Sequence, residues 1–292
     1  MYRKYLLPIL IIAFVSLACS LTINLPDLQN KTGPTQTDTI NVPLPENPQA
    51  AANVTINFGI GDLNVQPGST TALVSGTAQY NVEDLKPAVT IDGSNISIEQ
   101  GNLQFTGIPF ANSKVINDWN LSLANSPMNL TIKAGAYSGN YELGGLSIQS
   151  LDVTDGASKV NLGFSEPNQV EMTTFKYMTG ASDVSLMGLS NTNADEIRFN
   201  GGAGSYTLDF SGELNRDVTV SIDAGVSSVT IIVPDGVPAE LNTSSTLITV
   251  NRSGGWQQSG NSYQLSGSGY KITIELKLGA GSLQLQTTGA GK

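Results

Sequence analysis

Apolar and polar residues alternate one by one along most of the chain. Examples are Val54-Thr55-Ile56, Leu121-Ser122-Leu123 and Leu130-Thr131-Ile132. A period of two is typical of a β-strand that buries one of its faces. We find no convincing stretch with the 3.6-residue period of an amphipathic helix. The pattern therefore predicts an all-β fold built from many short strands.

A seven-residue motif recurs within this alternation. It reads glycine, small apolar, glycine or serine, polar, large apolar, polar, large apolar, and it occurs at 59–65, 156–162, 180–186, 202–208, 225–231 and 279–285. A seventh copy at 135–143 fits with two residues inserted. The starts at 135, 156, 180, 202 and 225 lie between 21 and 24 residues apart. This period predicts a single-chain β-solenoid with coils of about 22 residues, in which the first glycine supplies a turn.

The motif also predicts which side chains point inward and which point outward. Its two large apolar positions should form two inward ladders, Leu63, Tyr141, Val160, Val184, Tyr206, Val229, Leu283 and Val65, Leu143, Leu162, Leu186, Leu208, Ile231, Leu285. The polar position between them should form an outward ladder of Asn64, Glu142, Asn161, Ser185, Thr207, Thr230 and Gln284. A row of neutral hydrogen-bonding groups suits a polymer better than a compact metabolite. We therefore identify Asn161, Ser185, Thr207 and Thr230 as candidate ligand contacts.

The N-terminal residues predict export and lipidation. Arg3 and Lys4 precede an apolar run at 6–18, which is shorter than the ~20 residues of a membrane-spanning helix. A basic start, a short apolar core and a small residue before a cut are typical of an export signal. The only cysteine, Cys19, follows Ala18 directly, and this arrangement resembles the lipobox of bacterial lipoproteins.

These features divide the chain into three parts. Residues 1–18 are predicted to be a lipoprotein signal peptide, and 19–50 to be the lipidated cysteine followed by a Pro/Thr-rich tether. Residues 51–292 are predicted to form the solenoid domain. The alternative for the N-terminus is an ordinary signal peptide with an incidental cysteine.

Composition excludes several kinds of chemistry. The 292 residues contain no His and one Cys, which excludes a Ser-His-Asp triad, His metal ligands, a thiolate zinc site and an internal disulfide. Twenty-four acidic residues stand against 14 basic ones, and the net charge of −10 argues against a nucleic-acid partner. We expect no cofactor.

Residues 51–292 resemble the toast-rack β-solenoid domains of bacterial cell-envelope proteins. The resemblance lies in the motif at 59–65, in 118–123 and 128–135 leading into the repeats, in 146–153, and in the closing segments 233–238, 254–256 and 271–274. Members of this family include candidate surface adhesins and membrane proteins linked to responses to cell-wall-active antibiotics. The resemblance implies a β-solenoid with no known catalytic site, and it transfers no functional residue to this chain.

Some residues outside the motif leave alternatives open. Trp256 lies among Gly, Ser and Gln, where an aromatic ring could stack on a sugar or could cover the end of the solenoid, whereas Trp119 is expected in the core. Asp152, Asp155 and Asp223 lie near successive turns. They could converge on one edge to bind calcium or act on a polysaccharide, or they could simply cap turns.

We therefore predict a non-enzymatic bacterial surface lipoprotein, exported and held on the extracytoplasmic side of a membrane by its lipidated N-terminus. It would act as an adhesin-like or envelope-interaction module whose partner is a cell-wall polymer, a polysaccharide or an envelope protein. A regulatory or sensory partner in the cell-envelope stress response is the first alternative, and a polysaccharide-acting β-helix enzyme is the second. Open strand edges would permit association unless the ends of the solenoid are capped.

Overall fold

The computed structural model describes residues 32–47, 49–101 and 115–289. This part of the chain is mostly β-strand, interrupted by two short 3₁₀ helices, η2 (Glu83–Leu85) and η3 (Leu189–Thr192). The prediction of an all-β protein is confirmed. The predicted signal peptide at 1–18 and Cys19 lie outside the described residues. Neither of the two described helices has the length and apolar character that crossing a membrane requires.

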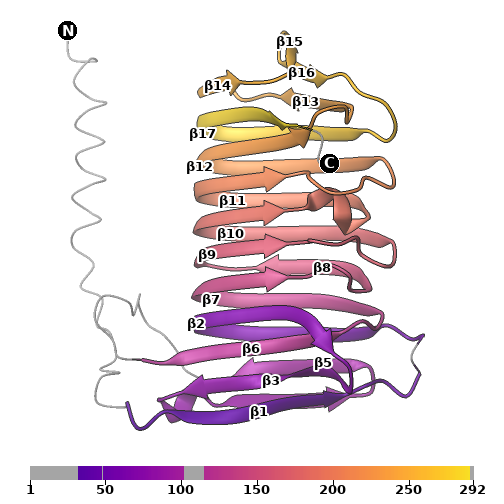
Figure 1. The fold of residues 1–292 in the computed structure, drawn as a ribbon. Coiled ribbons are helices and arrows are strands. Elements are labelled where there is room, and N and C mark those ends of the chain that lie inside the picture. Colours follow the sequence, from indigo (N-terminus) through magenta and orange to yellow (C-terminus); the bar gives the residue numbers. More distant parts are fainter. Residues whose placement is uncertain (1–31, 48, 102–114, 290–292) are drawn as a thin grey trace, which may run out of the picture.

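Six long strands form the central stack. They are β2 (Ala52–Ser69), β7 (Met128–Glu142), β10 (Met172–Met187), β11 (Ala194–Asp209), β12 (Val218–Pro234) and β17 (Ile272–Thr288). Each one bends at its motif glycine, so that its two halves belong to two sheets that lie face to face (Figure 1).

Shorter strands complete the two sheets. The first sheet contains the first halves of the long strands with β5 (Asn95–Gln100), β8 (Ile148–Thr154) and β13 (Ala239–Thr243). The second sheet contains the second halves with β6 (Asn117–Ala124), β9 (Ala157–Gly163) and β14 (Ile248–Arg252). Neighbouring strands of this stack run parallel and in register. The prediction of a single-chain β-solenoid is thus confirmed.

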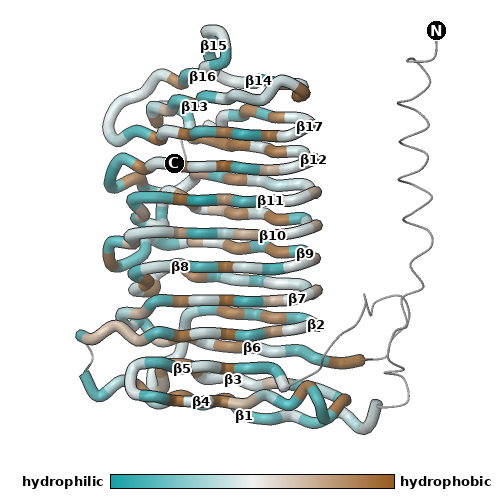
Figure 2. Tube along the Cα trace, turned by 180° about the vertical axis from the view of Figure 1, so that it is seen from behind, coloured by the Kyte–Doolittle hydropathy of each residue, from teal (hydrophilic) through white to brown (hydrophobic). Residues whose placement is uncertain are grey.

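The apolar side chains between the two sheets form a continuous core. Hydrophobic and hydrophilic positions alternate along the strands in Figure 2, as the sequence pattern requires. Five residues of the first inward ladder stack as expected and are at most 1% exposed: Val160, Val184, Tyr206, Val229 and Leu283. Trp119 is buried in this core, as expected, with its ring edge-to-face to Phe58 at a centroid distance of 5.3 Å.

The motif copy at 135–143 pairs without the two inserted residues. Gly139 lies opposite Leu63 on one neighbouring strand and Val160 on the other. Asn140 lies in the same way between Asn64 and Asn161. Tyr141 lies between Val65 and Leu162. The predicted ladder positions of Tyr141, Glu142 and Leu143 are therefore wrong, because Gly139, Asn140 and Tyr141 occupy them. The physical reason is that Gly139 has no side chain to fill its place in the core. The rings of Tyr137 and Tyr141 fill it instead, and lie 2.8 and 3.0 Å from where a Cβ on Gly139 would be.

The motif glycines stack in a column along the bend. A Cβ on Gly180 would lie 2.4 Å from the carbonyl oxygen of Gly156, and one on Gly202 would lie 2.4 Å from that of Gly180. Among the glycines of the motif, positive φ occurs only at its third position, at Gly61 and Gly281. The first glycine thus lies at the bend, as expected, but it is required there by the close approach of neighbouring backbones and not by a positive φ.

At each end of the stack, the strands do not follow one another in sequence order. β2 pairs with β7 on one side and with β5 and β6 on the other. Likewise β17 lies between β12 and the pair β13 and β14, although it follows them in sequence. The strands inserted between β2 and β7 account for the long interval between the motif copies at 59 and 135. Those inserted between β12 and β17 account for the interval between the copies at 225 and 279.

Antiparallel strands are added at both ends. At the C-terminal end, β16 (Ser262–Leu265) pairs with β13 and with β15 (Gln257–Ser259). At the N-terminal end, β3 (Ala72–Tyr80) pairs with β6, and β4 (Pro87–Asp92) pairs with β5.

The N-terminal end also contains β1 (Gln36–Pro43), which pairs antiparallel with β3. The prediction that the tether runs from 19 to 50 is wrong over this strand. Ile40 and Val42 alternate with polar residues and are 1% exposed, so their burial in the core stabilises a strand in a segment that looked like a linker.

Candidate functional site

A row of asparagines lies on the outer side of the second sheet. It consists of Asn120 on β6, Asn64 on β2, Asn140 on β7 and Asn161 on β9, which are neighbours through strand pairing. We refer to these four residues as the asparagine row. Parallel strands lie about 4.8 Å apart, so the four amides form a linear array along the axis of the solenoid.

The asparagine row occupies a groove of about 560 Å³. The groove is also lined by Gln66, Glu142 and Met187. Met187 is 47% exposed and gives the groove an apolar contact surface beside the amides. Glu142 accepts hydrogen bonds from the backbone N–H groups of Gly144 and Ser165, at 2.7 and 3.0 Å. The groove therefore combines neutral polar groups, one anchored carboxylate and one exposed thioether.

The amides of the row retain hydrogen-bonding capacity. Asn64 Nδ2 donates to Asn120 Oδ1 at 3.1 Å, and Asn161 Nδ2 donates to Asn140 Oδ1 at 3.4 Å. A side-chain amide has two N–H donors and an oxygen with two lone pairs. A ligand with several hydroxyl groups could use the remaining donors and acceptors.

A second asparagine row, on the first sheet, is more completely linked to itself. Ser150 Oγ donates to Asn129 Oδ1, Asn129 to Asn53 and Asn53 to Asn95, at 2.8, 2.9 and 2.8 Å. These shorter bonds make that row a stabilising ladder and provide a comparison for the row in the groove.

Three of the four predicted contact residues lie beyond the groove. Asn161 is exposed inside it, whereas Ser185, Thr207 and Thr230 continue the same row on β10, β11 and β12 and are half-buried. Sequence reasoning missed Asn120 and Asn140. Asn120 joins the row through a pairing across 56 residues, which local alternation does not reveal.

Trp256 is not an exposed sugar-stacking residue. It is 3% exposed, belongs to the core, and its Nε1 donates to the carbonyl oxygen of Gln286 at 3.3 Å. The stacking hypothesis is wrong, and the structure agrees with the alternative in which Trp256 covers the end of the solenoid.

The three aspartates near the turns do not converge. Asp152 is on the outer side of β8 and pairs with Lys176 at 3.7 Å, and Asp223 stands beside Lys277 on β12 and β17. Asp155 is instead buried between the sheets. Within the described ranges, no group of three or more acidic residues is placed to hold a metal ion.

Asp155 lies in an interior cluster of hydroxyl groups. Tyr177 Oη donates to Asp155 Oδ2 at 2.7 Å, Tyr137 Oη lies 3.4 Å from the same oxygen, and Thr179 binds Oδ1. Burial raises the pKa of the Tyr177 hydroxyl well above its ordinary value, and the charge of Asp155 adds to the effect. Burial also raises the pKa of Tyr137 and of Tyr141.

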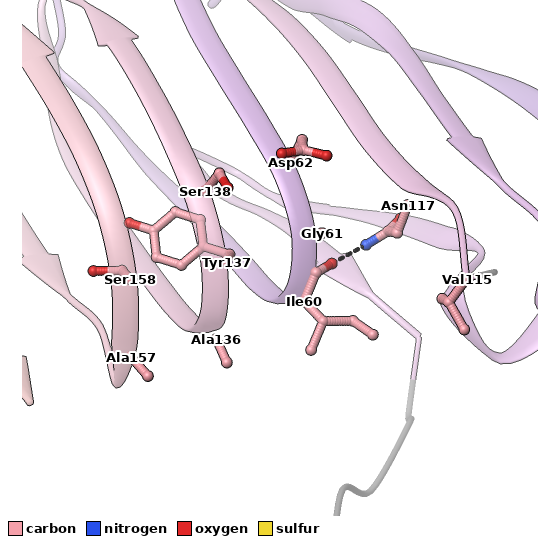
Figure 3. Close-up of a pocket in the computed structure, with 10 residues that line it drawn as sticks. All are labelled: Ile60, Gly61, Asp62, Val115, Asn117, Ala136, Tyr137, Ser138, Ala157 and Ser158. Carbon is pink, nitrogen blue, oxygen red and sulfur yellow. Dashed lines mark hydrogen bonds between the residues drawn. The ribbon is translucent and has the colours of Figure 1, made fainter. Parts of the chain in front are cut away.

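A smaller hollow of about 400 Å³ lies at the bend, where Tyr137 forms its aromatic wall (Figure 3). Alanine, glycine and serine form much of the remaining lining, and Asp62 is its one charged residue among those described. Asn117 Nδ2 is already bound to the carbonyl oxygen of Ile60 at 2.6 Å, as the dashed line shows. The groove with the asparagine row therefore offers the richer set of available polar groups.

This geometry defines a class of protein, the capped β-solenoid of two facing sheets, here with an exposed row of polar side chains. The sequence matches the family described as the N-terminal domain of toast_rack over residues 31–174 and 167–232, which is more than half of the chain. The chain belongs to the toast-rack family.

Solved structures share the fold at low sequence identity. A candidate cell adhesion protein from Clostridium sporogenes gives a TM-score of 0.50 with 19% identity, over 87% of this chain and 100% of the other. A candidate lipid-binding protein from Parabacteroides distasonis gives 0.40 with 10% identity, over 86% and 97%. A candidate adhesin from Parabacteroides merdae gives 0.37 with 13% identity, over 88% and 97%. No curated protein sequence matches the chain significantly.

Proposed function

We propose that this protein is a non-enzymatic surface module that binds a neutral, hydroxyl-rich polymer along the asparagine row. The observation that carries the proposal is the alignment of four side-chain amides in one open groove, at the spacing of the strands. A regular array of this kind matches a ligand that repeats along its length, because each repeat meets the same set of donors and acceptors. Sugar hydroxyl groups supply the complementary donors and acceptors.

Charge supports a neutral ligand over an acidic one. The chain has a net charge of −10, and Glu142 is the carboxylate that lines the described groove. A negatively charged polymer would be repelled by this field, most strongly at low ionic strength. Met187, whose side chain is exposed, can pack against the apolar face of a sugar ring.

We also propose that the module is displayed outside the cytoplasm by a lipid on Cys19. The proposal rests on the sequence at 1–19, and the toast-rack fold of a candidate cell adhesion protein is consistent with a surface location. Mass spectrometry of the mature N-terminus tests it directly. Replacing Cys19 by Ala should release the protein from the membrane fraction, and retention of the variant in that fraction would contradict the lipid anchor.

Binding by the groove is tested with purified full-length protein and soluble polymers. The probes are two neutral polymers, hydroxyethyl cellulose and dextran, with teichoic acid as the acidic comparison. The Asn64→Ala/Asn140→Ala double variant should weaken saturable binding of a neutral polymer by about tenfold or more. The matched Asn53→Ala/Asn129→Ala variant removes two amides from the outer side of the first sheet and should bind like the wild type.

Three outcomes of this experiment would contradict the proposal. Equal loss of binding in both double variants would show that the groove is not the site. Release of reducing ends from any polymer would replace a binding module with an enzyme. Absence of binding to all three probes would also overturn the proposal, and it would favour a protein partner in the envelope.

A further inference from the structure

Within the described residues, the N-terminal end of the solenoid finishes in two edge strands, β4 and β1, and β1 pairs only with β3. The exposed side chains of β1 are polar apart from Pro43. β4 pairs with β5 through a two-residue turn, Gly93-Ser94, and no other described strand pairs with it. Gly93 has φ 57°, which is typical of the first position of a type II′ hairpin turn. In such a hairpin the residues flanking the turn, Asp92 and Asn95, form a hydrogen-bonded pair, and bonded and non-bonded pairs then alternate. The N–H and C=O groups of Ile91 and Val89 therefore point away from β5, toward the open edge.

The side chains at this edge are apolar and exposed. Val89 and Ile91 are 40% and 49% exposed, and they stand opposite Ile98 and Ile96, which are buried. Cross-strand partners share a face of the sheet, so Val89 and Ile91 continue the inward face of the first sheet beyond the covered core. Figure 2 shows β4 together with β1 at this end of the stack.

An apolar groove adjoins this edge. It has a volume of about 510 Å³ and is lined by Ile91, Ile96 and Leu73 together with Leu44 and its neighbouring prolines. Leu44 is itself 44% exposed. The edge and the groove together expose aliphatic side chains that an added strand would cover.

The opposite end of the molecule is protected in the usual ways. Its terminal strands β14 and β15 have five and three residues, and the three residues of β15 are all polar. Short length, polar side chains and proline are common means of blocking strand addition. β4 has six residues, and its one proline, Pro87, is at the first position.

Charge indicates the character of the occupant. Glu46 lies in the groove and Asp92 ends β4, whereas the nearby Lys86 is paired with Asp38 at 3.8 Å. A cationic segment is attracted to this surface. A second copy of this acidic chain would bring two such ends together and be repelled.

We infer that the open edge of β4 and the adjoining groove receive an extended, cationic polypeptide strand from a partner protein. Its backbone pairs with Val89 and Ile91, its alternate apolar side chains extend the core, and its Lys or Arg residues face the acidic rim. Strand addition of this kind derives affinity from main-chain hydrogen bonds and specificity from side-chain pockets. This site is separate from the asparagine row, and its test does not depend on polymer binding.

The test uses a blocked, fluorescently labelled synthetic peptide that alternates Val and Lys, titrated into the full-length protein and followed by anisotropy. A peptide that alternates Val and Glu is the charge comparison. Ile91→Lys should weaken binding of the Val/Lys peptide about tenfold or more. Thr90→Lys adds the same charge on the opposite face of β4 and should change binding by about twofold at most.

A third variant isolates the backbone contribution. Ile91→Pro removes an N–H that points away from β5, so β4 should keep its hydrogen bonds to β5 while losing one to the peptide. Circular dichroism and the thermal midpoint check that each variant is folded. The inference is overturned if the Val/Lys peptide does not bind, or if Ile91→Lys and Thr90→Lys bind it equally. It is also overturned if sedimentation shows a wild-type dimer that Ile91→Lys dissociates, because the edge would then belong to a second copy.

Discussion

The hydroxyl of Tyr177 donates a 2.7 Å hydrogen bond to Oδ2 of Asp155 inside the solenoid. The two residues come from different coils, and Thr179 binds the second carboxylate oxygen. A buried carboxylate is costly unless its oxygens accept hydrogen bonds. The hydroxyl cluster thus stabilises Asp155 and joins neighbouring coils through a polar contact within an apolar core.

Tyr177→Phe should destabilise the protein by about 1–3 kcal/mol, because it deletes a hydrogen bond to a buried carboxylate. Tyr206→Phe is the matched comparison. Tyr206 is also fully buried, but its hydroxyl has no hydrogen-bond partner among the described residues, so its removal should be neutral or slightly stabilising. Equilibrium unfolding in urea gives both values, and equal losses would show that the Asp155 contact contributes nothing specific.

The same cluster predicts lower stability at alkaline pH. Burial raises the pKa of Tyr177 and Tyr137 above the value of about 10 that tyrosine has in an unfolded chain. Below pH ~10 both states keep these protons, and the full stability is present. Above it the unfolded state loses protons that the folded state retains, so stability falls as pH rises toward the folded pKa, by at most about 1.4 kcal/mol per pH unit for each tyrosine.

Urea unfolding at a series of pH values from neutral to strongly alkaline measures this slope. Tyr177→Phe removes one of the titrating groups and should make the decline shallower. An unchanged slope in this variant would show that Tyr177 is not responsible for the pH dependence.

The middle of the solenoid could be predicted from the sequence because its signals are local. Val160, Val184 and Val229 occur at the same position of a motif that repeats every coil, and parallel in-register stacking places them in one ladder. The ends could not be predicted in this way. β2 and β17 pair with strands far away in sequence, and only the folded topology decides which coil is outermost.

The candidate site was predictable in part for the same reason. Asn161, Ser185, Thr207 and Thr230 do share one row, although their role in binding stays a prediction. Asn140 was missed because the template expects a large residue where Gly139 stands, and tyrosine rings fill that space from other positions. Trp256 looked exposed because its sequence neighbours are polar, whereas its burial comes from packing at the end of the stack.

Two glycines should respond differently to replacement by alanine. Gly281 has φ 134°, and a Cβ there would lie 1.9 Å from the carbonyl oxygen of Ser227 in the next coil. Gly260 has φ 61° in a turn with no heavy atom within 4 Å of the added Cβ. We expect Gly260→Ala to cost about 1–2 kcal/mol from backbone strain alone, and Gly281→Ala to cost more than about 3 kcal/mol because the coils must separate. Similar losses in chemical denaturation would show that close stacking at the bend is dispensable.

Arg216 links the beginnings of three successive coils. Its Nη2 lies 2.5 Å from Glu171 and its Nη1 2.5 Å from Asp195, and its Nε donates to Asn193 at 3.1 Å. Its side chain is 23% exposed, whereas those of Glu171 and Asp195 are 74% and 56% exposed, so the ion pairs are open to solvent and to salt. Arg216→Lys keeps the charge but cannot reach all three partners, because an ammonium group lacks the planar fork of a guanidinium. We expect a loss of about 1 kcal/mol in urea unfolding, smaller at high salt.

Arg198→Lys is the matched control for this prediction. Arg198 contacts Glu196 of its own strand, and its side chain is 53% exposed, so the change should leave the unfolding midpoint unchanged. If the two variants lose stability equally, the effect belongs to arginine in general and not to a contact between coils. If Arg216→Lys has no effect, backbone pairing alone holds the coils together at this edge, because the guanidinium contacts would then contribute nothing measurable.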